Sequence, residues 1–213
     1  FEKAAEQRDI KAQYILGTLY DKGQGVEQDF TKAVYWFEKA AKQGNVAAQF
    51  SLGIRYGKGQ GVEQDYAKAV YWFEKAAKQG NVSAQFNLGV LYDKGQGGEQ
   101  DYGKAAYWYK KAAEQGNAAA QFSLGSFYDY GMSIEQDYAK AAYWYEKAAE
   151  QGDTNAQFVL GTLYYKGQGV EQDYIKATYW FGKSAGQGNA KAQYNLAFCY
   201  EHGLGVTKNI ARA

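Results

Sequence analysis

The sequence lacks most of the residues that disulfides, metal sites and membrane spans require. Its 213 residues include one cysteine and one histidine, so no disulfide can form within the chain. No apolar run approaches the ~20 residues that a membrane-spanning helix needs. Lys plus Arg number 24 and Asp plus Glu 23, a net charge of +1, which argues against binding through bulk charge. We therefore expect no nucleic-acid partner and no insertion into a membrane.

The single cysteine and histidine, Cys199 and His202, lie one helical turn apart. Such a spacing can bring a thiol and an imidazole together. No third residue that would orient the imidazole is evident, and a zinc site usually takes at least three protein ligands. We expect no catalytic residue, no metal and no cofactor, and the chain is predicted not to be an enzyme.

The sequence instead contains one motif that is repeated every 36 residues. The dipeptide Ala-Gln begins at residues 12, 48, 84, 120, 156 and 192 without drift. A fixed period in the range of roughly 20 to 50 residues is typical of solenoids, in which each unit buries its apolar face against a neighbour. Five full repeats with a partial repeat at each end give a single array over residues 1–213.

The chain opens and stops inside a repeat, which predicts a fragment of a longer protein. Any signal peptide would then lie upstream of Phe1. The compartment is left open, and export to the periplasm or secretion is one alternative.

One repeat is predicted to form two amphipathic helices. Ala48, Leu52 and Tyr56 lie at i, i+4 and i+8, on one face of the first helix. The glycine-rich residues 57–61 end that helix, because glycine adopts the left-handed C-cap conformation without steric cost. Asp65 is placed to cap the start of the second helix. The apolar face of this second helix is formed by Ala69, Trp72, Phe73, Ala76 and Ala77.

The stretch from Ala84 to Asn117 reads AQFNLGVLYDKGQGGEQDYGKAAYWYKKAAEQGN and resembles the Sel1-like repeat, a relative of the tetratricopeptide repeat. The matching pattern is AQ, LG, Y, GxG, QDY, KA, W and KAA, and the resemblance covers essentially the whole chain. It implies an all-α fold, a right-handed α/α superhelix (solenoid) of 36-residue helix-loop-helix repeats, whose first helices line a concave groove. It also implies a scaffold or adaptor that holds other proteins, of the kind found in bacteria. The chain departs from the family in two ways. It has no proline, and it lacks the paired cysteines of one bacterial subgroup.

A candidate binding surface lies on the first helices, at about 200° from the predicted core face. The residue two after each Ala of Ala-Gln is aromatic there, and two variable series flank it. If the fold matches the family, this surface lines the groove and suits an extended peptide or a partner helix. The alternative, given equal weight, is that these aromatic residues pack against the first helix of the adjacent repeat. The predicted partner-binding residues are Phe50, Ile54, Ser83, Phe86, Val90, Ala119, Phe122, Ser126, Asn155, Phe158, Thr162 and Tyr194.

Two further aromatic series occur once per repeat. Tryptophans at 36, 72, 108, 144 and 180 are predicted to pack in the core. Tyrosines at 35, 71, 107, 143 and 179 are predicted to be exposed on the convex side. In the fourth repeat, Tyr130, Met132 and Ile134 replace Lys, Gln and usually Val, which marks either a contact site or drift in a loop.

The leading hypothesis is a monomeric, non-enzymatic scaffold that binds a protein or peptide in the concave groove. The runner-up is a protein that binds envelope or host glycans, or glycoproteins, through the exposed tyrosines. A hydrolase is a distant third, because such activity has been attributed to relatives.

Overall fold

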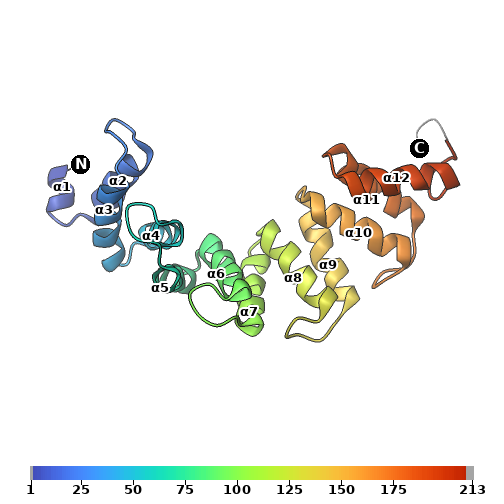
Figure 1. Ribbon diagram of the computed structural model, residues 1–213, viewed down its shortest axis with the longest axis horizontal. Helices are drawn as coiled ribbons and strands as arrows, with labels where there is room; N and C mark the ends of the chain where they lie inside the picture. Colours follow the sequence, from blue (N-terminus) through green and yellow to red (C-terminus); the bar gives the residue numbers. More distant parts are fainter. Residues whose placement is uncertain (1, 210–213) are drawn as a thin grey trace. The chain divides into compact units, whose positions relative to one another are not determined.

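The computed structural model describes residues 2–209, and within this range it contains twelve α-helices and no strand (Figure 1). A short helix α1 is followed by eleven helices of 13 residues each. Their bounds are α1 Glu2–Glu6, α2 Ile10–Lys22, α3 Phe30–Lys42, α4 Val46–Lys58, α5 Tyr66–Lys78, α6 Val82–Lys94, α7 Tyr102–Glu114, α8 Ala118–Tyr130, α9 Tyr138–Glu150, α10 Thr154–Lys166, α11 Tyr174–Gly186 and α12 Ala190–His202. The predicted all-α fold of 36-residue helix-loop-helix repeats is confirmed.

The helices begin and end at the capping residues that the sequence predicts. The carboxylate of Asp65 accepts a hydrogen bond of 2.9 Å from the backbone N–H of Lys68 at the start of α5. Asn81 caps α6 in the same way. Helix α4 ends at Gly59, which lies in the left-handed region at φ 67°. These side chains satisfy backbone groups that a helix terminus leaves without a partner.

Contacts divide the chain into two units, Phe1–Trp108 and Tyr109–Ala213, and the boundary lies within α7. In the N-terminal unit, α2 packs on α3 and α4 on α5, while α3–α4 and α5–α6 contacts join successive repeats. In the C-terminal unit, α8 packs on α9 and α10 on α11, while α9–α10 and α11–α12 contacts join the repeats. Each unit is therefore a stack in which a helix contacts its neighbours along the chain.

A glycine inside the first helix lets the two helices of a repeat approach closely, at Gly17, Gly53, Gly125 and Gly161, whereas α12 has Ala197 at this position. A Cβ atom added to Gly125 would lie 2.8 Å from the ring of Tyr145, and one added to Gly161 would lie 2.7 Å from the ring of Phe181. The sequence predicts a close approach here, by a helix of the same or of the next repeat. The ring comes from the second helix of the same repeat.

A buried glutamine joins each repeat to the one before it. The side chain of Gln157 donates a hydrogen bond of 3.1 Å to the carbonyl oxygen of Ala149, in the last turn of α9. Its own carbonyl oxygen accepts a hydrogen bond of 2.8 Å from the side chain of Gln187. The glutamines of the first five Ala-Gln pairs are all at most 5% exposed. The repeated Gln therefore connects three successive helices in the stack.

The tryptophan series is only partly in the core. Trp36 and Trp72 are buried, as predicted, whereas Trp108, Trp144 and Trp180 are half-buried. Each lies edge-on to the tyrosine before it in the chain, with ring centroids 4.9–5.0 Å apart.

Candidate partner-binding site

The phenylalanines predicted to line the groove are half-buried along the first helices. In the C-terminal unit, the ring of Phe122 in α8 lies 5.5 Å from that of Tyr145 in α9. Phe158 in α10 lies 6.2 Å from Phe181 in α11. Both rings therefore pack on the second helix of their own repeat. Both residues are only partly buried.

The same arrangement occurs in the N-terminal unit. Phe50 in α4 is half-buried with its ring 5.7 Å from that of Phe73 in α5. Ile54, Phe86 and Val90 are also half-buried. They give α4 and α6 an apolar strip next to the core of this unit.

The other predicted residues of the surface differ in exposure. Ser83, Ala119 and Asn155 are exposed, and Tyr194 is 72% exposed. The hydroxyls of Ser126 and Thr162 are half-buried and donate hydrogen bonds to carbonyl oxygens one turn earlier in their helices. None of the twelve predicted residues is fully buried.

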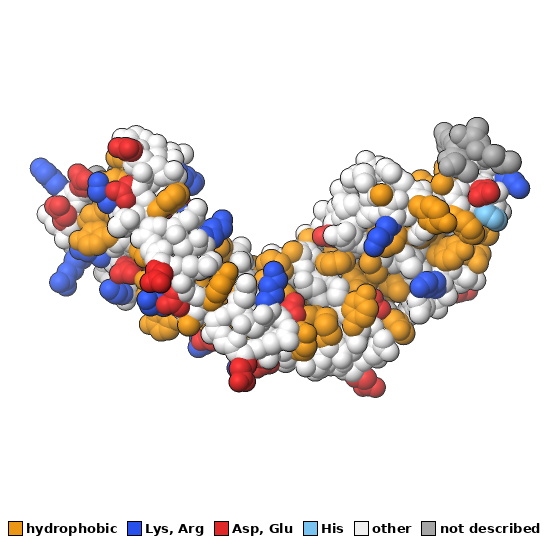
Figure 2. All heavy atoms as spheres, in the orientation of Figure 1, with side chains coloured by type: hydrophobic (Ala, Val, Ile, Leu, Met, Phe, Trp, Pro, Cys, Tyr) orange, Lys and Arg blue, Asp and Glu red, His pale blue; other side chains and the backbone are white. Residues whose placement is uncertain are grey.

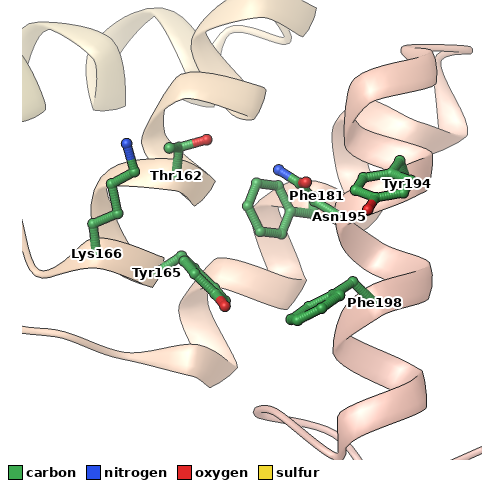
Figure 3. A pocket seen from close by; sticks show the side chains of 7 residues that line it. All are labelled: Thr162, Tyr165, Lys166, Phe181, Tyr194, Asn195 and Phe198. Atoms are coloured by element: carbon green, nitrogen blue, oxygen red, sulfur yellow. The ribbon is translucent and has the colours of Figure 1, made fainter.

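A hollow of about 280 Å³ lies between α10, α11 and α12, within the C-terminal unit (Figure 3). It brings together two of the predicted residues, Thr162 and Tyr194. In Figure 3 Tyr165 of α10 and Phe198 of α12 project toward one another, with Phe181 between the two helices. The lining residues are Thr162, Tyr165, Lys166, Phe181, Tyr194, Asn195 and Phe198.

Five of these lining residues, Tyr165, Lys166, Phe181, Asn195 and Phe198, are not among the twelve predicted residues. A signal was present for Tyr165, because the same position of the repeat is Asp at residues 21, 93 and 129. Phe198 belongs to a variable series that the sequence places on this side, and it is the one aromatic residue in that series. The structure thus joins two unusual residues from successive repeats.

A second hollow, of about 370 Å³, lies between α8 and α10 in the same unit. Thr162 and Lys166 line both hollows, so the two adjoin along α10. Tyr130, which replaces the Lys of most other repeats, lines the second hollow and is 72% exposed. Figure 2 shows hydrophobic side chains gathered over the C-terminal unit.

Asp129 adds a carboxylate to the second hollow. The hydroxyl oxygen of Tyr145 lies within hydrogen-bonding distance of Ser126 Oγ, at 3.1 Å, and of Asp129 Oδ2, at 3.3 Å. Burial raises the pKa of Asp129 above its ordinary value, against the opposing effects of the Tyr145 hydrogen bond and the charge of Lys166. Burial is also the main cause that raises the pKa of Tyr145.

The tyrosine series lies on the second helices and is exposed, as predicted. Each of these tyrosines is 51–54% exposed. The ammonium group of a lysine four residues later lies over several of the rings, at 4.6 Å for Lys39 over Tyr35 and 5.9 Å for Lys147 over Tyr143. A hollow of about 260 Å³ in the C-terminal unit is lined in part by Tyr143, Trp144 and Lys147.

The cysteine and histidine are not arranged as a nucleophile and base. Cys199 is fully buried, and burial raises the pKa of its thiol, which favours the protonated form. The ring of His202 instead stacks on Phe198, with centroids 4.1 Å apart. Residues 2–209 contain no group of three or more side chains that could hold a metal ion. In the same range, no helix has the length and apolar character needed to cross a membrane.

Six consecutive segments of the chain match the Sel1 repeat, at residues 10–45, 46–81, 82–117, 118–153, 154–189 and 190–213. The chain belongs to the Sel1 repeat family. Members of this family are generally scaffolds for protein interactions and are typically not enzymes. No curated protein sequence matches this Sel1 repeat chain.

Solved structures of bacterial proteins share the fold of this Sel1 repeat chain. One is c5321, a protective antigen present in uropathogenic Escherichia coli strains, at 44% identity and a TM-score of 0.97 over all of this chain and 45% of that one. A second is a Sel1 repeat protein from Oxalobacter formigenes, at 40% identity and a TM-score of 0.87 over 97% of this chain and 84% of that one. A third, from Klebsiella pneumoniae, has 27% identity and a TM-score of 0.52 over 91% and 94%. The chain thus spans less than half the length of the E. coli protein.

Proposed function

We propose that this chain is a non-enzymatic scaffold that binds a protein or peptide partner along its first helices. The observation that carries the proposal is the hollow between α10 and α12, where Thr162 and Tyr194 lie among further aromatic side chains. Central aromatic anchors surrounded by smaller residues are typical of protein interfaces. An extended segment or a helix laid across successive first helices would meet such an anchor in each repeat.

Within each unit, the proposed surface combines half-buried anchors with an exposed rim. Phe122 and Phe158 act as anchors in the C-terminal unit, and Ala119 and Asn155 lie at the rim. We propose that the whole chain forms one array and that it acts as a monomer.

A selection from a phage-displayed library of random peptides tests this function without knowledge of the partner. Peptides that bind the chain should be titrated against Asn155→Arg, which places a bulky cation on the exposed rim without removing a core side chain. We expect binding to weaken about tenfold or more. Tyr143→Ala, on the second-helix face, is the matched control and should bind as the unchanged chain does. Peptides that lose affinity with Tyr143→Ala alone would contradict the proposal.

A second candidate function is glycan binding through the tyrosine series. The hollow lined by Tyr143, Trp144 and Lys147 favours it, because sugars stack on aromatic faces and Tyr offers contact area at low entropic cost. A glycan array probed with the unchanged chain and with Tyr143→Ala tests it. Glycan binding that depends on Tyr143 would support this candidate.

A further inference from the structure

We infer that the hollow between α10 and α12 receives one bulky apolar side chain of a peptide that carries an acidic residue next to it. This inference rests on the proposed function and specifies the chemistry of the peptide at one site of that surface. It follows from the size of the hollow, its lining and the sign of its charge.

The size of the hollow suits a single side chain. Ligand pockets for small molecules and cofactors usually run from about 300 to 1,000 Å³. At about 280 Å³, this hollow lies at the lower limit of that range. A leucine, phenylalanine or tryptophan side chain is a better match in size than a cofactor.

The lining is aromatic on several sides. Tyr165 comes from α10, Phe181 from α11, and Tyr194 and Phe198 come from α12 (Figure 3). Aromatic side chains bury large areas and favour edge-on or offset contacts with other rings. An apolar anchor placed between Tyr165 and Phe198 would therefore be contacted from both helices.

The aromatic lining is specific to this place in the array. Tyr165 stands where the preceding repeat has Asp129, which lines the hollow between α8 and α10. Phe198 stands where the two preceding repeats have Ser126 and Thr162. The two substitutions remove a carboxylate and add two aromatic rings, so this hollow differs in chemistry from the adjacent one.

The charge of the lining residues decides which kind of residue is expected next to the apolar side chain of the bound peptide. Lys166 is the one charged residue among the lining residues, and no acidic side chain is among them. Its side chain is exposed and forms no ion pair within residues 2–209, while its charge also acts on Asp129 of the adjacent hollow. A cluster of aromatic rings can also bind a cation, but a lysine at the rim opposes that ligand by like-charge repulsion. An acidic neighbour in the peptide is the complementary choice.

The test uses variants that restore residues found elsewhere in the array. Tyr165→Asp and Phe198→Thr introduce side chains that other repeats carry at the same positions, so the fold should tolerate them. Peptides selected on the unchanged chain should be rich in a bulky apolar residue beside Asp or Glu. Each variant should weaken their binding about tenfold or more. Tyr179→Asp, at an exposed tyrosine on the second helix of the same repeat, is the matched control and should leave binding unchanged.

Reversal of charge tests the second half of the inference. Lys166→Glu should change the preferred neighbour from acidic to basic in matched synthetic peptides that differ at that residue alone. Lys58→Glu, at the same position of the second repeat, should not.

Selected peptides with a basic neighbour, or peptides that bind Tyr165→Asp and Phe198→Thr with full affinity, would overturn the inference. If that binding is still lost with Asn155→Arg, the proposed function stands while the inference fails. If Asn155→Arg also has no effect, both fail.

Discussion

The side-chain amide of Gln151 donates a hydrogen bond of 2.7 Å to the side-chain oxygen of Gln121, thirty residues earlier in the chain. Gln121 in turn donates a hydrogen bond of 3.1 Å to the carbonyl oxygen of Ala113, in the last turn of α7. A helix end leaves such carbonyls without an intrahelical partner. The buried side chain of Gln121 therefore donates to a carbonyl at the end of α7 and accepts from Gln151, which follows the last residue of α9.

Replacement of Gln121 by Leu should destabilise the chain by about 2 kcal/mol. The substitution preserves much of the volume but removes the hydrogen bonds from Gln121 to Ala113 and from Gln151 to Gln121, each worth about 0.5–1.5 kcal/mol. The carbonyl of Ala113 keeps its hydrogen bond from the backbone N–H of Gly116. Urea unfolding followed by circular dichroism gives the change in midpoint. Gln24→Leu, at an exposed loop position, is the control and should unfold at nearly the same urea concentration as the unchanged chain.

The same substitution at two helical glycines should have opposite effects. Gly125→Ala places a methyl group within 2.8 Å of the Tyr145 ring, so the two helices of that repeat must separate. We expect a loss of about 1–3 kcal/mol. At Gly182 in α11 an added Cβ meets no atom within 4 Å. Gly182→Ala should therefore stabilise the chain by up to about 1 kcal/mol, through helix propensity alone.

Thermal unfolding of the two variants checks this pair. A gain in stability for Gly125→Ala would show that the approach of α8 and α9 is not limited by the ring.

Arg55 and Asp21 should be strongly coupled. Arg55 Nε lies 3.1 Å from Asp21 Oδ1, and Nη2 donates a hydrogen bond of 3.2 Å to Oδ2. Both side chains are largely buried, and three other repeats have Leu at the position of Arg55, at residues 19, 91 and 163. Asp21→Ala leaves a buried guanidinium group without its carboxylate, which should destabilise by about 3 kcal/mol or more. Arg55→Leu should be much milder, since a packed apolar side chain replaces the ion pair.

A double-mutant cycle with Asp21→Ala and Arg55→Leu measures the coupling. Equal losses for the two single variants would contradict this account of the pair.

Low pH should destabilise the second helices of the repeats, because it protonates the aspartates that cap them. The pKa of the capping carboxylate is lowered below the ordinary 3.8 at Asp29, Asp65, Asp101 and Asp137. The main cause is the hydrogen bond that each carboxylate accepts from the backbone N–H three residues later. A carboxyl whose pKa is lowered by folding adds stability above the unfolded pKa and loses it as the pH falls through the folded pKa. This contribution is therefore present at neutral pH and is lost below about pH 4.

A variant with Asn at all four positions tests the acid effect, because Asn also caps helices but does not ionise. Its unfolding midpoint in urea should change less between pH 5 and pH 2 than that of the unchanged chain. Parallel pH profiles for the two proteins would assign the acid sensitivity to other groups.

The helices of this fold could be predicted closely from the sequence, but the glutamine bonds could not. Periodicity and capping residues are local signals, so the bounds of a helix such as α5 follow from Asp65 and the residues after it. The partner of Gln121 is thirty residues away on another helix, and no local pattern reports it. A recurring polar residue directly beside a buried Ala was the available signal.

The candidate site could be predicted only in part for a related reason. Thr162 and Tyr194 follow from helical geometry within their own repeats. Phe181 comes from a second helix, whose contact with the hollow depends on how three helices pack together. Tyr165 was available from a comparison of equivalent positions, since it replaces an Asp.

The glutamine bonds reach no further than the adjoining helices, and this has a consequence for how such arrays evolve. Insertion or loss of a whole repeat brings an equivalent Gln to the new junction, so the same bonds can form again. Duplication of 36-residue segments is then tolerated, and array length becomes a variable trait. A position such as 165 or 198 can meanwhile diverge in a single repeat without disturbing the junctions on either side. A recognition surface can in this way be revised one repeat at a time.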